Sequence, residues 1–157
     1  MEAGTSPIVQ SRIGPPGLRS LVVDIYPPTL RSAGLPAALR DLAATAPVPA
    51  QLLLDEDAIA FLNPEQQQAM FRVAQECLRN TSKHAAAKQA VVRIGAKGDD
   101  VVLEVRDDGR GFDPSRRTQA HLGISLMSDV ATGVGARLDL RTAPGHGTSW
   151  RMRVPVA

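Results

Sequence analysis

The sequence predicts an α+β fold arranged as a two-layer sandwich. Apolar residues recur at helical spacing in some segments and alternate as in strands in others, and the helical segments interleave with two antiparallel hairpins. The length of 157 residues fits one compact domain. Apolar residues make up 43% and charged residues 22%, an ordinary globular balance. The chain is therefore expected to fold around a single core.

Composition excludes several classes of protein. Lys and Arg number 18 and Asp and Glu 16, so the formal net charge of +2 argues against a strongly basic nucleic-acid binder. Three Phe, one Trp and one Tyr are too few for a base-stacking platform. The lone Cys77 can form no intrachain disulfide, and the three histidines are too far apart for an H-E-x-x-H metal helix. No apolar run approaches the roughly 20 residues that span a bilayer.

The first part of the chain is expected to hold a leader and two short helices. Residues 1–17 lack periodicity and end in G-P-P-G, which indicates a disordered leader or a cloning scar. From Leu18, apolar steps of three and four predict a helix that Pro27-Pro28 ends. A second short helix is expected from about Leu35, and the Pro/Ala-rich stretch 45–49 indicates a linker.

Beyond the linker the sequence predicts a strand, a long helix and a hairpin. The strand covers 51–55. Asn63 as cap and Pro64 at the first position predict a helix that runs to about Ala87. Two strands rich in β-branched residues, 91–94 and 101–105, are joined by a hairpin turn at 97–100.

The last elements follow a polar, glycine-rich stretch at 107–122. A helix is expected from Gly123 to about Thr132. Residues 137–141 and 149–154 alternate on either side of a turn at 144–147, which predicts a second hairpin. Trp150, Met152 and Val154 should lie on one side of it.

The first candidate functional site lies along one edge of the long helix. At about 100° per residue, Glu76, Asn80 and Lys83 fall together on the border of its apolar stripe. An acid, an amide and an amine so placed can hold a metal, a water and a phosphate, although a plain solvated edge shows the same pattern. The stripe itself should face the core and comprises Met70, Val73, Ala74, Cys77 and Thr81.

The second candidate place is the segment D-D-G-R-G-F at 107–112, directly after a predicted strand. Asp107 at the strand end can accept a hydrogen bond from an exocyclic amine. Gly109 and Gly111 let the backbone approach a ligand that a Cβ would exclude. A simple turn between strand and loop is the alternative.

The third candidate place joins Gly123 with Gly147 and Thr148. Gly123 is predicted to open a helix, whose N-terminal amides form an anion site. Gly147 and Thr148 begin the last strand, where the hydroxyl could add a phosphate contact. A helix start and a hairpin turn explain the same residues.

Taken in order, these motifs resemble the ATP-binding domain of histidine kinases. Its N, G1 and G2 boxes are similar to Q-E-C-L-R-N-T-S-K-H-A (75–85), D-D-G-R-G-F (107–112), L-G-I-S-L-M (122–127) and G-H-G-T-S (145–149). The wider group, the Bergerat-fold ATPases, includes type II topoisomerase subunits, Hsp90 and mismatch-repair proteins. The resemblance covers about 18–155 and implies a mostly antiparallel mixed sheet with helices on one face.

The start of the chain carries a second resemblance. Residues 18–42, with Y-P-P-T-L-R-S-A-G-L-P-A-A-L inside them, resemble the end of the dimerisation region in the NarL-type histidine kinases, which pair with LuxR-type response regulators. The resemblance implies that 18–45 is a remnant of the dimerisation and phosphotransfer helices. It implies that 46–157 is the catalytic ATP-binding domain.

The resemblance assigns roles around the phosphates. Asn80 matches the asparagine that coordinates the Mg²⁺ bridging the ATP phosphates, and one protein oxygen suffices because Mg²⁺ keeps several waters. Glu76 matches the acid that acts as a base or orients the metal's water. Lys83 and His84 match the pair beside the phosphates.

The resemblance also assigns roles around the adenine. Asp107 matches the acid that recognises the adenine amino group, Gly109 and Gly111 match the glycines that shape the pocket, and Thr148 matches a threonine near the adenine. Gly123 matches the glycine at the hinge of the ATP lid.

The lid itself would comprise 113–122, with Arg116, Arg117 and His121 as basic residues, and should be mobile without nucleotide. The family often shows G-x-G-L where this chain has H-L-G-I. The single glycine, Gly123, leaves the geometry of the hinge open.

One departure from the family matters for function. No histidine precedes His84, so the phosphoacceptor is absent. We therefore expect the catalytic end of a longer sensor histidine kinase, which binds ATP and Mg²⁺ and transfers the γ-phosphoryl group to a histidine on a helix missing from this chain. The isolated chain should bind ATP without labelling itself.

The same reading implies partners and a location. The full-length protein should be a homodimer with a LuxR-type response regulator as partner and no nucleic acid, and its catalytic portion should be cytoplasmic. One alternative is a regulatory serine kinase of the anti-sigma type, against which the Y-P-P segment argues. Another is an ATP-gated switch of the topoisomerase or Hsp90 branch, which needs a longer chain.

Overall fold

The computed structural model describes residues 27–83, 86–113, 115 and 120–156. The predicted leader and the predicted helix from Leu18 lie outside these residues, as do His84, Arg116 and Arg117. For Lys83 and His121 the described part is the backbone.

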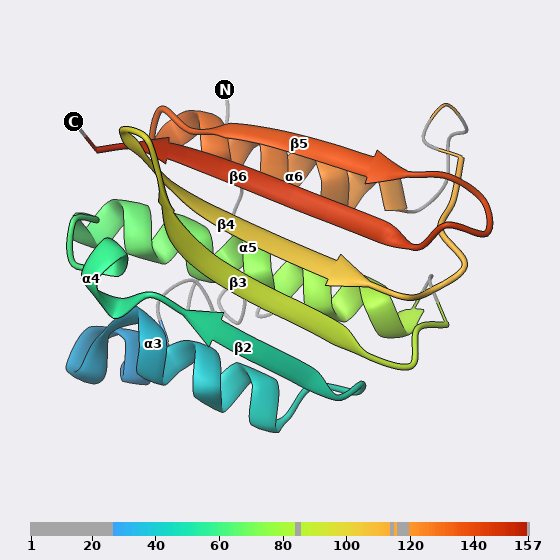
Figure 1. Ribbon diagram of the computed structural model, residues 1–157, viewed down its shortest axis with the longest axis horizontal. Coiled ribbons are helices and arrows are strands. Elements are labelled where there is room, and N and C mark those ends of the chain that lie inside the picture. The colour runs from blue at the N-terminus through green and yellow to red at the C-terminus, as the bar shows by residue number, and fades with distance from the viewer. Residues whose placement is uncertain (1–26, 84–85, 114, 116–119, 157) are drawn as a thin grey trace, which may run out of the picture.

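The predicted α+β two-layer sandwich is confirmed (Figure 1). The sheet has the strand order β2-β3-β4-β6-β5, in which β2 is parallel to β3 and every other pair is antiparallel. Its strands are β2 (Ala50–Leu54), β3 (Ala90–Lys97), β4 (Asp100–Asp107), β5 (Arg137–Thr142) and β6 (Thr148–Pro155). The long helices cover one face, and they are α3 (Pro28–Ala44), α5 (Pro64–Lys83) and α6 (Ala120–Gly133), with the short α4 (Glu56–Ile59) beside them.

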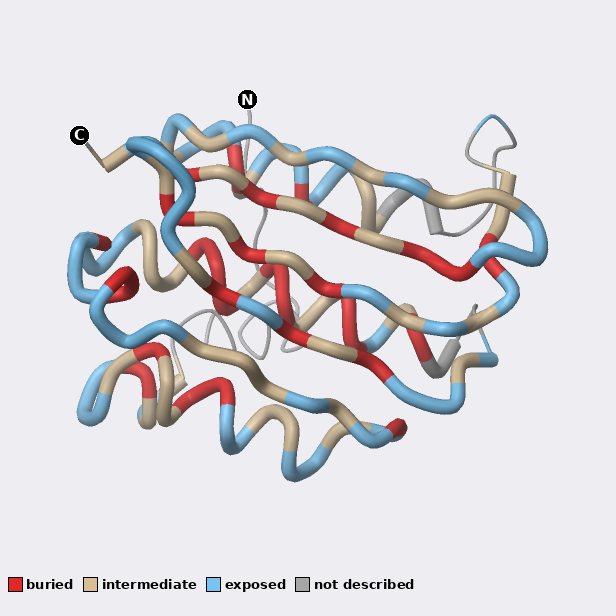
Figure 2. Tube along the Cα trace, in the orientation of Figure 1, coloured by how far each residue is buried: buried red, intermediate tan, exposed pale blue. Residues whose placement is uncertain are grey.

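The core lies between the sheet and the helices. Figure 2 shows buried residues alternating with more exposed ones along β4 and β6, as expected for strands with one covered face. Trp150, Met152 and Val154 all face this core, as predicted. So does the predicted stripe of α5, whose members Met70, Val73, Ala74, Cys77 and Thr81 are each no more than 1% exposed.

The start of α5 follows its sequence signals. Asn63 Oδ1 accepts from the N–H of Gln66 at 2.8 Å, and Gln66 Oε1 accepts from the N–H of Asn63 at 2.9 Å. This reciprocal capping box, with Pro64 at the first helical position, satisfies free N–H groups at the helix start.

The predicted end of α5 at Ala87 is wrong, because the helix ends at Lys83. Ala86 has a positive φ of 49°, and the N–H of Ala87 donates to Thr81 O at 3.3 Å. The chain therefore turns back after the helix with one residue in the left-handed conformation. Glycine usually occupies such a position, and here alanine does.

Other boundaries also differ from the prediction. A helix begins at Pro28, since a proline is tolerated in the first turn, and Gly34 (φ 88°) breaks it just before the predicted start at Leu35. Asp55, predicted in a strand, instead caps α4 by accepting from the N–H of Ala58 at 3.1 Å. Helix α6 begins at Ala120 and not at Gly123, so the last residues of the predicted lid are helical.

Helix α3 packs on the same core as the rest of the fold. Leu35 and Leu39 are almost completely buried, and Gln67 Oε1 of α5 accepts from the N–H of Leu35 at 3.3 Å. The predicted boundary between 18–45 and 46–157 stays a prediction. None of the helices in the described part of the chain is long and apolar enough to cross a membrane.

Candidate functional site

Two of the predicted site residues, Glu76 and Asp107, lie near one another where β4 ends beside α5. Burial raises the pKa of the Cys77 thiol well above its usual range, and the charges of Glu76 and Asp107 raise it further. Both carboxylates therefore lie near this buried residue of α5. Cys77 Sγ also lies 3.7 Å from Met127 Sδ, which joins α5 to α6 at the same place.

Glu76 lies at the contact between α5 and α6. Its Oε1 is 3.5 Å from the Arg79 guanidinium, and about a fifth of its side chain (21%) is exposed. A Cβ built on Gly123 would lie only 2.7 Å from Glu76 Oε2. The carboxylate thus occupies the space that the missing side chain of Gly123 leaves open.

Asn80 follows Glu76 by one helical turn and is partly exposed. Within the described part of the chain its side-chain amide makes no hydrogen bond, so its oxygen is available to a ligand. The described residues contain no group of three His, Cys, Asp or Glu that could hold a metal. Asn80 and Glu76 offer oxygen donors of the kind that Mg²⁺ takes when phosphates and waters complete its shell. Lys83 continues the same helix at its last residue.

Asp107 ends β4 opposite Thr148 of β6. Its Oδ1 accepts from the N–H of Gly109 at 2.8 Å. Burial raises the pKa of Asp107 above its usual range, and the charge of Asp108 adds to this, whereas the backbone amides of Gly109 and Thr148 act in the opposite direction. Asp107 is therefore a half-buried acid whose charge depends on hydrogen-bond donors.

Asp108 has a role that the sequence did not reveal. Its Oδ1 accepts from the N–H groups of Lys88 (2.8 Å) and Gln89 (3.1 Å). These amides hold the pKa of Asp108 below its usual range. The exposed carboxylate ties the segment after α5 to the end of β4, next to Asp107.

Thr142 is a second residue that sequence reasoning missed. Its hydroxyl donates to Gly147 O at 3.0 Å and accepts from the N–H of Phe112 at 3.1 Å. It is also 3.0 Å from the hydroxyl of Thr148. Because Thr142 has one proton and gives it to Gly147, Thr148 is the donor of that pair. The only sequence signal was that Thr142 ends the predicted strand beside the turn.

Two glycines of the motifs allow backbone to approach backbone. Gly111 has φ 65°, and a Cβ there would collide with Ala143 O. Gly147 has φ 69°, and a Cβ there would lie 2.5 Å from Asp107 O. The loop after β4 and the turn before β6 therefore interlock, and contact of Gly109 and Gly111 with a ligand stays a prediction.

Gly123 does not open a helix, which corrects the predicted anion site. It lies in the first turn of α6, after the start at Ala120, so the first free helical amides belong to earlier residues. His121, predicted in a loop, has a helical backbone, whereas His146 lies in the turn between β5 and β6 as predicted.

Comparison with known proteins gives a consistent family. Residues 65–157 match the model described as histidine kinase-, DNA gyrase B-, and HSP90-like ATPase. The sensor histidine kinase LiaS of Bacillus subtilis (strain 168) is 27% identical over 143 residues, which cover 88% of this chain and 39% of LiaS. The histidine-protein kinase/phosphatase DegS of Brevibacillus brevis is 32% identical over 88 residues, which cover 56% of this chain and 23% of DegS. The chain thus spans well under half the length of these relatives.

Solved structures share the fold. The blue-light activated histidine kinase EL346 of Erythrobacter litoralis superposes with a TM-score of 0.61 at 19% identity, covering 88% of this chain and 44% of that one. The histidine kinase AdeS of Acinetobacter baumannii gives 0.56 at 12% identity, covering 88% and 64%.

Proposed function

The chain belongs to the family of histidine kinase-, DNA gyrase B-, and HSP90-like ATPases, and on this premise we propose that it is the ATP-binding catalytic part of a sensor histidine kinase. One observation carries the proposal. The half-buried Asp107 at the end of β4 and Glu76 of α5 both lie close enough to Cys77 to raise its pKa, and Asn80 follows Glu76 by one helical turn. An acid for the base and oxygen donors for the phosphates are thereby brought to one place.

Each residue then has a defined task. Asp107 accepts a hydrogen bond from the adenine amino group, with Thr148, Gly109 and Gly111 forming the walls around the base. Asn80 would hold Mg²⁺, which supplies charge neutralisation to the phosphates when bound. Catalysis of phosphoryl transfer depends mostly on such positioning and charge.

Transfer itself requires an acceptor and a base. The γ-phosphoryl group would pass from ATP to an imidazole nitrogen of the acceptor histidine, with ADP as the leaving group. Glu76 is placed to take the proton from that imidazole or to orient a water, and Lys83 and His84 would lie beside the phosphates. Gly123 gives the Glu76 carboxylate its room.

The acceptor and partners follow from the resemblance of the Y-P-P segment. We propose that 18–45 is the end of a dimerisation region, that 46–157 is the catalytic domain, and that the full-length protein is a cytoplasmically acting homodimer of the NarL type. Its partner would be a LuxR-type response regulator.

Incubation with γ-labelled ATP and Mg²⁺ tests this function. We expect no acid-labile label on the 157-residue chain alone. Acid-labile, base-stable label should form on dimerisation helices from the full-length protein when these are added. Robust acid-labile label on the chain alone would contradict the proposal, and acid-stable label on an added protein would favour a serine-directed kinase.

A further inference from the structure

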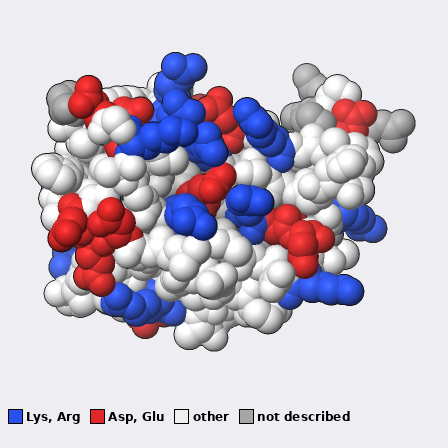
Figure 3. Space-filling view, in the orientation of Figure 1, with Lys and Arg blue, Asp and Glu red and all other residues white. Residues whose placement is uncertain are grey.

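The outer face of the sheet, which the helices leave uncovered, carries a concentration of arginines. Figure 3 views this face and shows Lys and Arg side chains gathered over it with acidic groups among them. We define the arginine face as the outward-pointing charged residues of β4, β6 and β5, which are Glu104, Arg106, Arg137, Asp139, Arg141, Arg151 and Arg153. All but Arg137 line a shallow hollow of about 880 Å³.

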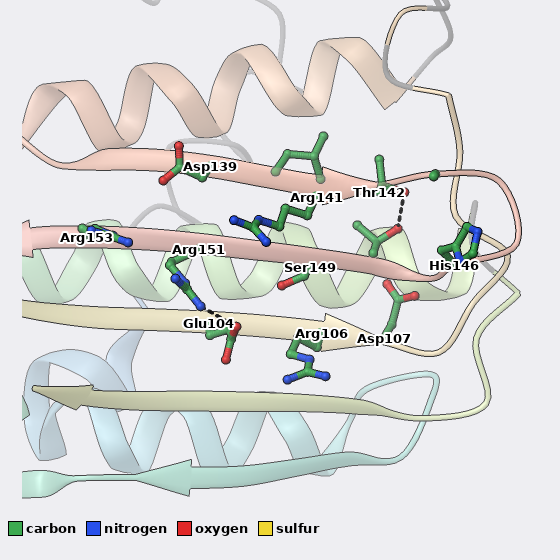
Figure 4. Close-up of a pocket in the computed structure, with 13 residues that line it drawn as sticks. Glu104, Arg106, Asp107, Asp139, Arg141, Thr142, His146, Ser149, Arg151 and Arg153 are labelled. Atoms are coloured by element: carbon green, nitrogen blue, oxygen red, sulfur yellow. Dashed lines mark hydrogen bonds and ion pairs between the residues drawn. The ribbon is translucent and has the colours of Figure 1, made fainter. Parts of the chain in front are cut away.

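Strand register gives the arginine face a definite pattern. Arg106 of β4 and Arg141 of β5 are both in register with Ser149 of β6, so two long side chains flank a short one (Figure 4). Their backbones are two strand spacings apart, or about 10 Å. At the far end of the hollow, Arg137 lies directly opposite Arg153. Basic pairs thus stand at both ends of the face.

Between these two basic pairs, three side chains in a row across the strands carry charges of alternating sign. Glu104, Arg151 and Asp139 are in register across β4, β6 and β5, and Arg151 bonds Glu104 at 3.2 Å. Figure 4 shows this pair at the centre of the hollow. Neutralisation within the face is therefore confined to its middle.

Among the described residues, no acidic side chain pairs with either of the two basic pairs. Within the described residues Arg106, Arg137 and Arg141 make no ion pair or side-chain hydrogen bond, and the buried Nε of Arg153 has no partner. Like charges directly opposite one another weaken a sheet, and buried unsatisfied donors are rare. Sheet stability therefore gives no reason for this arrangement, whereas an anionic partner would.

We propose that the arginine face docks an acidic surface of a partner protein. Carboxylates of the partner would bind the guanidinium groups of the two basic pairs, an arrangement that permits bidentate bonds. A basic group of the partner would meet Asp139. A continuous phosphate backbone fits less well, because Glu104 and Asp139 lie in its path and none of the described residues that line the hollow is Phe, Tyr or Trp. The arginine side chains lie on the face opposite the helix layer that carries Asn80, and at one end their hollow reaches Asp107 and Thr148.

Fluorescence anisotropy with three probes tests the proposal at about 0.15 M salt. The probes are a labelled poly-Glu peptide, a single-stranded oligonucleotide of equal charge, and phosphatidylserine vesicles. The variants are Arg106→Glu/Arg141→Glu and Arg137→Glu/Arg153→Glu. Arg31→Glu/Arg40→Glu on the exposed side of α3 is the control, because it changes the net charge equally. A thermal unfolding midpoint close to that of the wild type verifies that each variant folds, and Arg106→Gln/Arg141→Gln serves if a charge reversal does not fold.

We expect the peptide to bind most tightly and each face variant to lose about tenfold or more in affinity, with less than about a twofold loss for the control. Amide shifts on peptide addition should map to β4, β5 and β6. An oligonucleotide or vesicle that binds more tightly than the peptide would overturn the choice of partner. Equal losses in the control and the face variants, or shifts elsewhere, would overturn the docking surface.

Discussion

Replacing Gly123 by alanine should separate stability from catalysis. A Cβ at this position would lie 2.7 Å from Glu76 Oε2, closer than any ordinary contact. The atom it meets is the far end of a flexible side chain, so the carboxylate can give way. To reach an ordinary distance of about 3.4 Å it must move by about 0.7 Å.

The effect of this substitution on stability should be small, and its effect on the rate of transfer should be large. Alanine improves helix propensity over glycine by up to about 1 kcal/mol, and forcing Glu76 off its rotamer costs about 0.5–1.5 kcal/mol. The free energy of unfolding should therefore change by no more than about 1 kcal/mol. A displacement of this size in a base can lower the rate of transfer by about 10²-fold.

Gly133→Ala is the matched control. It lies in the same helix α6, and its added Cβ would meet nothing within 4 Å. Thermal unfolding, ADP affinity and the rate of transfer to added dimerisation helices should be measured for both variants. We expect similar stability and ADP binding for both, with a slow transfer only for Gly123→Ala.

A double-mutant cycle isolates the cause. On a Glu76→Gln background, Gly123→Ala should have little further effect on the rate, because both changes act through the same carboxylate. Additive losses in rate, or a rate equal to that of Gly133→Ala, would refute the reasoning.

Three further substitutions follow from the site. Asn80→Ala should remove most of the Mg²⁺-dependent part of ATP binding, and equal affinities of wild type and variant for a fluorescent ATP analogue with Mg²⁺ would count against the metal assignment. Asp107 should favour ATP over GTP by about tenfold or more, because guanine presents a carbonyl to it. The raised pKa of Asp107 should fall when the adenine of ADP donates a hydrogen bond to the charged carboxylate. ADP affinity should therefore decrease as the pH falls through that pKa. Carbon NMR of the Asp107 carboxyl, recorded with ADP and with GDP, shows whether the pKa falls on binding. Thr142→Val removes the hydroxyl that bonds Phe112 N–H and Gly147 O. It should lower the free energy of unfolding, measured by chemical denaturation, by about 1–3 kcal/mol and weaken ADP binding. The control Thr45→Val should do neither, because the Thr45 hydroxyl bonds carbonyls of its own helix.

Local signals explain why much of the fold could be predicted. The capping box of Asn63 and Gln66 and the turn of the first hairpin depend on residues close in sequence. The early stop of α5 could not be predicted, because Ala86 adopts a left-handed conformation that alanine rarely takes. The segment that follows the helix is bonded to Asp108, which lies 20 residues beyond Lys88.

In the candidate site, too, features that depend on neighbouring residues could be predicted and features that depend on distant residues could not. The edge of Glu76 and Asn80 follows from helical periodicity alone. Thr142 could not be found this way, because its partner Phe112 is 30 residues away and only the sheet order brings them together. Hydrogen bonds across such separations leave no pattern in a single sequence.

The glycines of these motifs illustrate how similar sequence signals divide into different physical roles. At Gly111 and Gly147 the backbone is left-handed and the space for a Cβ is filled by carbonyl oxygens, which cannot move without breaking the end of the sheet. At Gly123 the backbone is helical, and the space is filled by the carboxylate of Glu76. The first two glycines therefore hold together the frame around Asp107, and replacing them should damage the fold. The third sets the position of one acid, so its substitution reports on chemistry in an intact frame.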